Sequence, residues 1–169
     1  MLKLTAWYPN KDYNWEYVQR LKFKAIADPR WPGWWCKMAL FELGVSFLYA
    51  DLDTVIVGDL PEPSRLTMLR DFYRPKLAQS GFMYVTADAA DVAWREWIAN
   101  PQKIMKRYRG DGEFLRDVWA GEHGYWQDDF PGKVVSYKVH CQHGLPEGAA
   151  VVCYHGHPRP HQTKWASHK

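Results

Sequence analysis

The sequence predicts a single α/β domain in which a mixed, mainly parallel central sheet is flanked by helices. Its 169 residues are enough for one substantial core and short for two. Short apolar runs, such as residues 45–50, alternate with longer stretches whose apolar residues recur at helical spacing. Aromatic residues make up 16% of the chain, which excludes a disordered protein. We therefore expect one folded domain over residues 1–169.

The first fifty residues predict two strands that alternate with two helices. Residues 2–7 alternate weakly and suit a first strand. A helix is expected over residues 13–27, and a second one over residues 34–43, where Gly44 is well placed as the C-terminal cap. A strand over residues 45–50 follows with almost no connection, which predicts a tight helix-to-strand unit.

The rest of the chain predicts further strands and helices and ends in an irregular tail. Proline and glycine mark the breaks between these elements. We expect an apolar continuation at residues 55–57, a short helix near residues 65–69, a strand over residues 80–85, a helix that ends near Ile98 and is capped by Asp88 or Asp91, a basic amphipathic piece after Pro101, a helix over residues 113–119 capped by Asp111, strands over residues 134–139 and 149–154, and the tail from about residue 156.

Composition limits the compartment and the partners. No stretch approaches the roughly 20 apolar residues of a membrane-spanning helix, and the apolar start of the chain is too short for a signal-peptide core. The three cysteines, Cys36, Cys141 and Cys153, form no Cys-x-x-Cys pair, which favours buried thiols in a reducing compartment. We therefore expect a cytoplasmic protein. The formal charge of +3 suits phosphate-bearing ligands without demanding nucleic acid.

Two acids stand where a buried strand should end. Asp51 and Asp53 follow the apolar run at residues 45–50, and the period of two in extended chain lets both side chains point the same way. Carboxylates are the oxygen ligands that hold Mg²⁺, with substrate phosphates completing its shell. Because ligands of open α/β sheets bind beyond the carboxyl ends of the strands, the pair predicts a metal-bound nucleotide diphosphate. The alternative is that the two aspartates belong to an ordinary turn and bind no metal.

A second apolar strand, at residues 149–154, also ends in ligand-type residues. His155 is a plausible third ligand to an ion such as Mn²⁺, because imidazole binds transition metals well. Gly156 would let a backbone N–H approach a phosphate, and Arg159 offers a forked grip on a diphosphate. The two strand ends are therefore expected to converge on one ligand.

The sequence resembles the GT-A-fold, metal-dependent glycosyltransferases of the glycogenin and lipopolysaccharide-galactosyltransferase type, and more closely their small bacterial and phage-encoded members. The resemblance covers roughly residues 32–160, and its parts occur in the family's order. They are a helix that bears Lys37, the strand that ends in Asp51-Leu52-Asp53-Thr54, the segment Ser80-Gly81-Phe82-Met83, the pair Gly110-Asp111, and a His-Gly-x-Pro-basic-Pro close at residues 155–160.

The resemblance implies a nucleotide-sugar donor, an acceptor and a divalent cation, usually Mn²⁺, although Mg²⁺ is also expected to serve. Asp51, Asp53 and His155 match the cation's ligands. Asp111 matches an acid near the reacting sugar, which makes it the expected catalytic residue. The matching donor contacts are Lys37, Ser80, Gly81 and Arg159, the last where the family usually has lysine.

The chain departs from the family's pattern in two ways. Gly112 follows Asp111 where relatives usually have glutamine, which weakens the assignment of Asp111. Only about thirty residues precede Pro32, room for one strand and one helix, whereas relatives usually have two or three strands there to bind the nucleoside. A non-catalytic nucleotide-sugar binder or structural protein of the same fold is therefore the first alternative.

Several other interpretations remain open. The basic run at residues 103–109 favours a nucleic-acid-binding or nucleic-acid-modifying protein, although such runs are usually a solvated helix face. Trp34 and Trp35 either stack on an acceptor or base or belong to the core. Lys37 could be an ordinary surface lysine, and Ser80-Gly81 only a strand start. A zinc site is a minor alternative, with candidates His140, Cys141, His143, Cys153, His155, His157 and His161. The acceptor (glycan, protein or nucleic acid) and the oligomeric state stay open.

Overall fold

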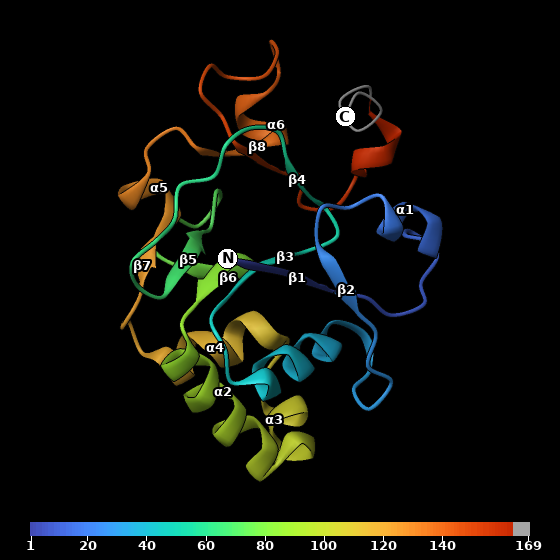
Figure 1. The fold of residues 1–169 in the computed structure, drawn as a ribbon, viewed down its shortest axis with the longest axis vertical. Coiled ribbons are helices and arrows are strands. Elements are labelled where there is room, and N and C mark those ends of the chain that lie inside the picture. Colours follow the sequence, from blue (N-terminus) through green and yellow to red (C-terminus); the bar gives the residue numbers. More distant parts are fainter. Residues whose placement is uncertain (164–169) are drawn as a thin grey trace.

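A mixed six-stranded sheet lies at the centre of the computed structural model, which describes residues 1–163 (Figure 1). Its order is β2-β1-β3-β6-β5-β7. Strand β1 pairs in parallel with β2 and β3, and β5 pairs in parallel with β7, whereas β6 runs antiparallel to both β3 and β5. The predicted fold class is therefore confirmed. The strands are β1 (Leu2–Ala6), β2 (Lys24–Ile26), β3 (Phe47–Ala50), β5 (Thr67–Arg70), β6 (Ala78–Val85) and β7 (Gly124–Tyr125).

A three-stranded sheet of order β4-β9-β8 packs beside the central one. It consists of β4 (Thr54–Ile56), β8 (Val134–Ser136) and β9 (Val151–Cys153). Strand β4 begins directly after Asp53, and the backbone N–H of Tyr154, just beyond β9, donates to the carbonyl oxygen of Asp53 at 3.0 Å. This pairing brings the two predicted ligand-bearing strand ends together.

Helices cover one face of the central sheet, and the small sheet lies toward the other (Figure 1). The covering elements are the 3₁₀ helix η1 (Gly33–Leu43), α2 (Ala87–Ala99) and α4 (Asp111–Trp119), with α3 (Pro101–Arg107) beside α2. The short elements elsewhere are α1 (Trp15–Gln19), α5 (Trp126–Asp129), α6 (Tyr137–His140) and η2 (Pro160–Gln162). No helix of the described residues has the length and apolar character that crossing a bilayer requires.

Strand β3 joins the two cores because its successive side chains point to opposite faces. Phe47 and Tyr49 pack into the core beneath the helices, whereas Leu48 and Ala50 pack against the small sheet. All four residues are at most 2% exposed. Full burial of side chains as large as Phe47 and Leu48, which pack on opposite faces, contributes about 1.5–3 kcal/mol each, so the backbone that leads to Asp51 is held firmly from both sides.

The expected helix over residues 13–27 is wrong. Helix α1 spans only Trp15–Gln19, with the Asn14 side chain accepting the N–H of Tyr17 as its cap. Residues Lys24–Ile26 instead form β2, paired in parallel with β1. The region before Pro32 therefore contains two strands, one more than expected. A partner strand more than fifteen residues away is a tertiary effect that local helical spacing does not report.

Several further elements differ from the expectation. Residues Thr67–Arg70 form β5 rather than a helix, because they pair with both β6 and β7.

The strand expected over residues 134–139 ends at Ser136, whose side chain accepts the N–H of Val139 and so begins α6. The 34–43 helix is of the 3₁₀ type, and Gly44 caps it as expected. The helix expected from residue 113 begins at Asp111, with Gly110 as its cap. The irregular tail contains η2, and residues 164–169 lie outside the described part.

Candidate active site

Asp51 and Asp53 lie at the carboxyl end of β3, between two cavities. The N–H of Asp51 still donates to the carbonyl of Gly81 on β6, and its own carbonyl accepts the N–H of Thr54 in a tight turn. One cavity, of about 280 Å³, is here called the N-terminal cavity, and the other, of about 190 Å³, the central cavity. Both aspartates line both cavities. A ligand that spans the two spaces therefore passes the two carboxylates.

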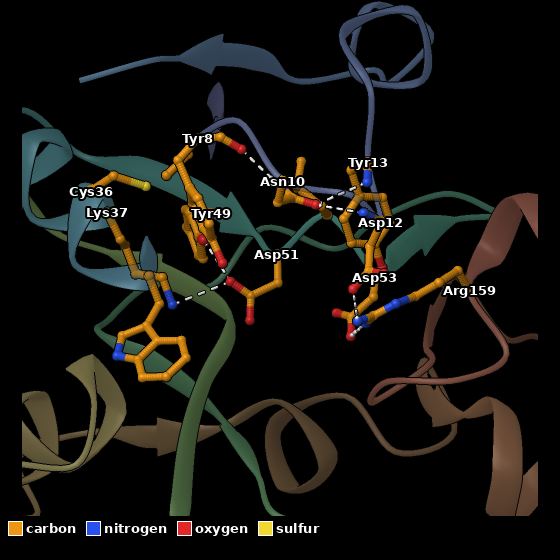
Figure 2. A pocket seen from close by; sticks show the side chains of 13 residues that line it. Tyr8, Asn10, Asp12, Tyr13, Cys36, Lys37, Tyr49, Asp51, Asp53 and Arg159 are labelled. Atoms are coloured by element: carbon orange, nitrogen blue, oxygen red, sulfur yellow. Dashed lines mark hydrogen bonds and ion pairs between the residues drawn. The ribbon is translucent and has the colours of Figure 1, made fainter. Parts of the chain in front are cut away.

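The two cavities differ in their walls. The N-terminal cavity is rich in aromatic and polar side chains from the first strand and the loop after it, and Figure 2 shows these side chains around the two aspartates. The central cavity is lined by small residues and by polar residues of β6, α4 and the loop after β9. Ala6, Tyr8, Asn10, Asp12, Tyr13, Trp34, Cys36, Lys37, Tyr49, Leu52 and Arg159 complete the N-terminal cavity; Thr54, Leu69, Gln79, Ser80, Gly81, Gly112, Arg116, Cys153 and His155 complete the central one.

Asp51 is oriented by two buried neighbours. The hydroxyl of Tyr49 donates to Asp51 Oδ1 at 2.5 Å, and Lys37 Nζ lies 3.2 Å from the same oxygen (Figure 2). The Lys37 ammonium also lies over the Tyr49 ring, 4.5 Å from its centroid. Burial raises the pKa of the Asp51 carboxyl, and Lys37 opposes that shift. Both contacts use Oδ1, which leaves Oδ2 outside the hydrogen bonds of the described residues.

Lys37 is the hub of a buried polar network. Its side chain is only 3% exposed, and its ammonium donates to Asp111 Oδ2 at 2.6 Å and to Ser80 Oγ at 3.1 Å. Ser80 Oγ in turn donates to Asp111 Oδ2 at 2.6 Å. Burial lowers the pKa of Lys37, but Asp111 and Asp51 together raise it above its ordinary value. An ammonium has three N–H donors, and Asp111 Oδ2, Ser80 Oγ and the carbonyl oxygen of Ser80 accept three hydrogen bonds from it, while Asp51 forms an ion pair with the same group.

Asp111 lines neither cavity in this structure. It is 7% exposed and opens α4, but Gly110 rather than Asp111 is the N-cap. The carboxylate is turned to Lys37 and Ser80. The predicted contact between Asp111 and a reacting sugar therefore stays a prediction, and its observed contacts are those of a positioning group.

Two glycines keep the central cavity open beside this network. A Cβ at Gly81 would lie 3.2 Å from Asp51 Oδ2, and a Cβ at Gly112 would lie 3.0 Å from Ser80 Oγ. Ser80 and Gly81 do line this cavity, as a small pair beside the first aspartate. Gly112, the departure from the family's usual glutamine, is the residue that lets α4 approach Ser80 so closely.

Asp53 is held by the loop after β9. The N–H of Gly156 donates to Asp53 Oδ2 at 3.1 Å, and Arg159 Nη1 lies 3.7 Å from the same oxygen. Gly156 has φ +93°, a left-handed conformation that suits glycine. Its N–H, expected to approach a phosphate, is thus engaged by a carboxylate.

Arg159 connects the end of the described chain to its beginning. Its Nη2 lies 2.5 Å from Asp12 Oδ2, and its guanidinium lies 5.1 Å from the centroid of the Tyr13 ring. Figure 2 shows Arg159 approaching Asp53 from the side opposite to Lys37 and Tyr49. The guanidinium of Arg159 therefore lies beside Asp12 and Asp53 in the wall of the N-terminal cavity.

His155 lies at the central cavity but is not assembled with the aspartates into a metal site. No group of three or more His, Cys, Asp or Glu residues among residues 1–163 is placed to hold a metal ion. The ring packs edge-on against Phe72, with centroids 5.0 Å apart, and its buried Nε2 has no hydrogen-bond partner. Burial lowers the pKa of His155. The backbone adopts φ +52°, uncommon for a residue other than glycine. The same finding leaves the zinc alternative without an assembled site in this part of the chain.

The adjacent tryptophans have different surroundings. Trp34 is 55% exposed and lines the N-terminal cavity, with its indole nitrogen 3.3 Å from where a Gly110 Cβ would stand. Trp35 is 6% exposed and stacks on Trp97 at 5.2 Å within the helical core. Of the two alternatives for Trp35, the structure selects the core.

Sequence reasoning missed Tyr49, Asp12 and Arg116. The contact of Tyr49 could have been predicted from the sequence, because residues two apart on a strand share a face and Tyr49 precedes Asp51 by two. Asp12 was missed because a helix was expected to begin directly after it, at residue 13. Arg116 lines the central cavity because it lies one helical turn after Gly112. The basic run at residues 103–109 lies on and after α3, where Lys103 and Arg107 line a separate groove between α2, α3 and α4.

Solved structures with a similar fold are glycosyltransferases. One involved in the glycosylation of the major capsid of PBCV-1 has a TM-score of 0.56 at 13% identity and covers 90% of this chain and 91% of that chain. The glycosyltransferase GlyE of Streptococcus pneumoniae TIGR4 has a TM-score of 0.54 at 13% identity, with 85% and 44% covered. An active-site mutant of LgtC has a TM-score of 0.51 at 14% identity, with 82% and 68% covered.

These comparisons establish the fold and confirm the predicted resemblance at that level. The chain spans less than half the length of the GlyE chain but nearly the whole length of the PBCV-1 one. The sequence matches no protein-family model and no curated protein.

Proposed function

We propose that this chain is a glycosyltransferase that moves a sugar from a nucleotide-diphosphate sugar to an acceptor, with a divalent cation, Mn²⁺ or Mg²⁺, at Asp51 and Asp53. The observation that carries this proposal is that the two carboxylates form the common wall of two unlike cavities. A nucleotide sugar also has two unlike halves, joined by a diphosphate. A donor that spans both cavities would place its diphosphate beside the aspartates.

The walls suggest which half goes where. The N-terminal cavity is the larger one and carries aromatic side chains, Tyr8, Tyr13 and Trp34, that suit a planar base. The central cavity is smaller, and its glycines and Ser80 leave room for a sugar ring. The guanidinium of Arg159 would bind the diphosphate through two N–H groups, and it would give up part of its ion pair with Asp12 to do so.

The donor atoms at the site suit a divalent cation. Asp51 Oδ2 and Asp53 Oδ1 lie outside the hydrogen bonds of the described residues, and His155 Nε2 is buried without a partner. Two carboxylates and an imidazole are ligands that Mn²⁺ accepts. The aspartates would hold the cation, and His155, which the structure does not assemble with them, would have to move to become a third protein ligand. A bound cation would supply Lewis-acid stabilisation of the diphosphate leaving group.

The chain's own residues would then position the reactants. Tyr49 and Lys37 fix the position of Asp51. Lys37 also links Asp51 to Asp111 and Ser80 at the edge of the central cavity. Such preorganisation is a large part of what a transfer reaction needs, because the groups pay no reorganisation cost during reaction. Asp111 acts through Lys37 in this scheme.

A nucleotide-sugar binder without turnover is the second candidate. It is favoured by the position of Asp111 outside both cavities and by the full engagement of Lys37 with protein acceptors. Binding would persist in such a protein, while transfer and donor hydrolysis would be absent.

Thermal shift with a panel of nucleotide sugars, with and without Mn²⁺, tests the proposal. We expect stabilisation that needs Mn²⁺, of about 2.7 kcal/mol at a hundredfold excess over Kd. Asp53→Asn should abolish it, whereas Asp59→Asn, at an exposed aspartate that lines neither cavity, should not. Stabilisation without donor hydrolysis selects the second candidate. Failure of every nucleotide sugar overturns both, and binding of DNA that falls steeply with salt would then favour the nucleic-acid alternative.

A further inference from the structure

We propose that the acceptor is a neutral carbohydrate and that it binds in a third cavity, beyond His155. This inference rests on the proposed function, because it names the acceptor class of the same site. The cavity, here called the β8 cavity, measures about 430 Å³. It lies between the loop after β5, strand β8 and the loop before β9. The lining residues used below are Arg70, Asp71, Phe72, Val134, His140 and Glu147.

The β8 cavity adjoins the central cavity through one aromatic ring. Phe72 packs on His155 at 5.0 Å and on His140 at 5.6 Å, measured between ring centroids. His155 lines the central cavity, and His140 lines the β8 cavity together with Phe72. The two cavities therefore adjoin at Phe72, and a chain of sugar units in the β8 cavity would have its reacting end on the side of His155 and the central cavity.

An exposed tyrosine stands at this junction. Tyr73 is 60% exposed, and its ring centroid lies 6.4 Å from that of His155. Its backbone is fixed, because Asp71 Oδ1 accepts the N–H groups of Tyr73 and Arg74, both at 2.8 Å. A pyranose ring has a face of C–H groups that packs on an aromatic ring, and a rigid ring loses little entropy on binding it. Tyr73 follows Phe72, which lines the β8 cavity, and its exposed ring has the position of such a platform.

The rest of the β8 cavity offers hydroxyl partners above an apolar floor. Val134 and Phe72 form part of the floor. Nδ1 of His140 accepts the N–H of Ser136 at 3.0 Å, so the neutral ring carries its proton on Nε2 and can donate there. The exposed carboxylate of Glu147 is an acceptor. A sugar hydroxyl, which both donates and accepts, matches this pair.

The charges of the β8 cavity favour a neutral ligand over an anionic one. Arg70 is engaged by the carbonyl of Pro75 and the carboxylate of Asp128, and Asp71 by Arg74. Glu147 makes no ion pair within residues 1–163, so it is the uncompensated charge of the lining. A nucleic acid or a phosphorylated acceptor would bring its own negative charge against it.

Binding of neutral disaccharides to the full chain tests this inference. Maltose, lactose and cellobiose are titrated at up to about 10 mM by calorimetry, where a Kd near 1 mM is measurable. We expect at least one to bind, with affinity roughly tenfold weaker in Tyr73→Ala and nearly retained in Tyr73→Phe. Trp15→Ala is the matched control, because Trp15 is also an exposed aromatic, at 43%, but its ring packs on Trp7 and not at the His155 junction.

The donor titration separates the two possible failures. Nucleotide-sugar binding with no disaccharide binding overturns this inference and leaves the proposed function standing. Disaccharide binding that Tyr73→Ala does not weaken overturns the site. Disaccharide binding without any nucleotide-sugar binding overturns the proposed function, and the acceptor role with it.

Discussion

The hydroxyl of Tyr49 donates a 2.5 Å hydrogen bond to Oδ1 of Asp51, the residue two places further along the chain. The ring of Tyr49 is buried under the helices, so a side chain anchored in the core aims the first carboxylate of the candidate metal pair. Tyr49 is thus a positioning residue whose deletion should affect both folding and ligand binding.

Tyr49→Phe should lower the free energy of unfolding by about 0.5–1.5 kcal/mol, because it removes the hydrogen bond to Asp51, whose side chain is 41% exposed. Urea unfolding measures this loss, and thermal shift with Mn²⁺ and a nucleotide sugar should show weaker stabilisation. The control is Tyr125→Phe, since the Tyr125 ring packs on Arg70 and its hydroxyl makes no hydrogen bond in the described part of the chain. Equal loss in both variants would contradict the assignment.

Lys37→Met should destabilise the protein by about 3–5 kcal/mol, because it leaves the buried carboxylate of Asp111 without its cation. Combining it with Asp111→Asn should restore part of the loss, since the stranded charge is then gone. Urea unfolding of the two single variants and the double variant closes this cycle.

The matched control for this cycle is Lys24→Met, at an exposed lysine, which should stay within about 0.5 kcal/mol of the wild type. Strict additivity of the Lys37 and Asp111 substitutions would show that the two groups do not interact.

Gly112→Ala should destabilise the chain by about 1–3 kcal/mol, although alanine normally favours a helix by about 1 kcal/mol over glycine. The new Cβ would lie 3.0 Å from Ser80 Oγ, and that hydroxyl is fixed by Lys37 and Asp111. Thermal unfolding measures the sign of the effect. A rise in Tm would mean that Ser80 moves aside freely.

Asp71→Asn should make the Tm of the protein depend less steeply on pH in the acid range. Burial raises the pKa of Asp71, but hydrogen bonds from Gln79, Tyr73 and Arg74 lower it below its ordinary value of 3.8. A carboxyl with a lowered folded pKa contributes stability above its unfolded pKa and loses it as pH falls through the folded one. The Tm of the wild type should therefore fall more steeply than that of the variant below about pH 4. Parallel curves, with Asp59→Asn as control, would contradict this.

The strand that ends at the aspartate pair and the helix before it could be anticipated from local pattern. The apolar run before Asp51 and the Gly44 cap are local signals, and both correspond to real boundaries. The helix expected over residues 13–27 failed because β2 exists only through pairing with β1. Likewise, nothing local in Thr67–Arg70 reveals that it bonds to strands on both sides.

The candidate site was predicted as a set of residue types, but its internal bonding was not. Lys37 and Asp111 are 74 positions apart and Asp12 and Arg159 are 147 apart, so their pairing depends on the completed fold. The outcome differs most for Lys37, which the family resemblance assigns to the nucleotide-sugar donor, whereas in the structure its ammonium contacts Asp51, Asp111 and Ser80. Exposed ligand residues and buried organising residues have the same amino-acid types, which is why pattern alone cannot separate them.

The bond between Asp12 and Arg159 has a consequence for the order of events during synthesis. A ribosome-bound chain that has emerged only as far as β9 already possesses every strand of both sheets, yet Arg159, which lines the N-terminal cavity, is still inside the exit tunnel. Both sheets can therefore form before the N-terminal cavity is complete. The wall made by the contact between Asp12 and Arg159 is added only after the loop that follows β9 has left the tunnel.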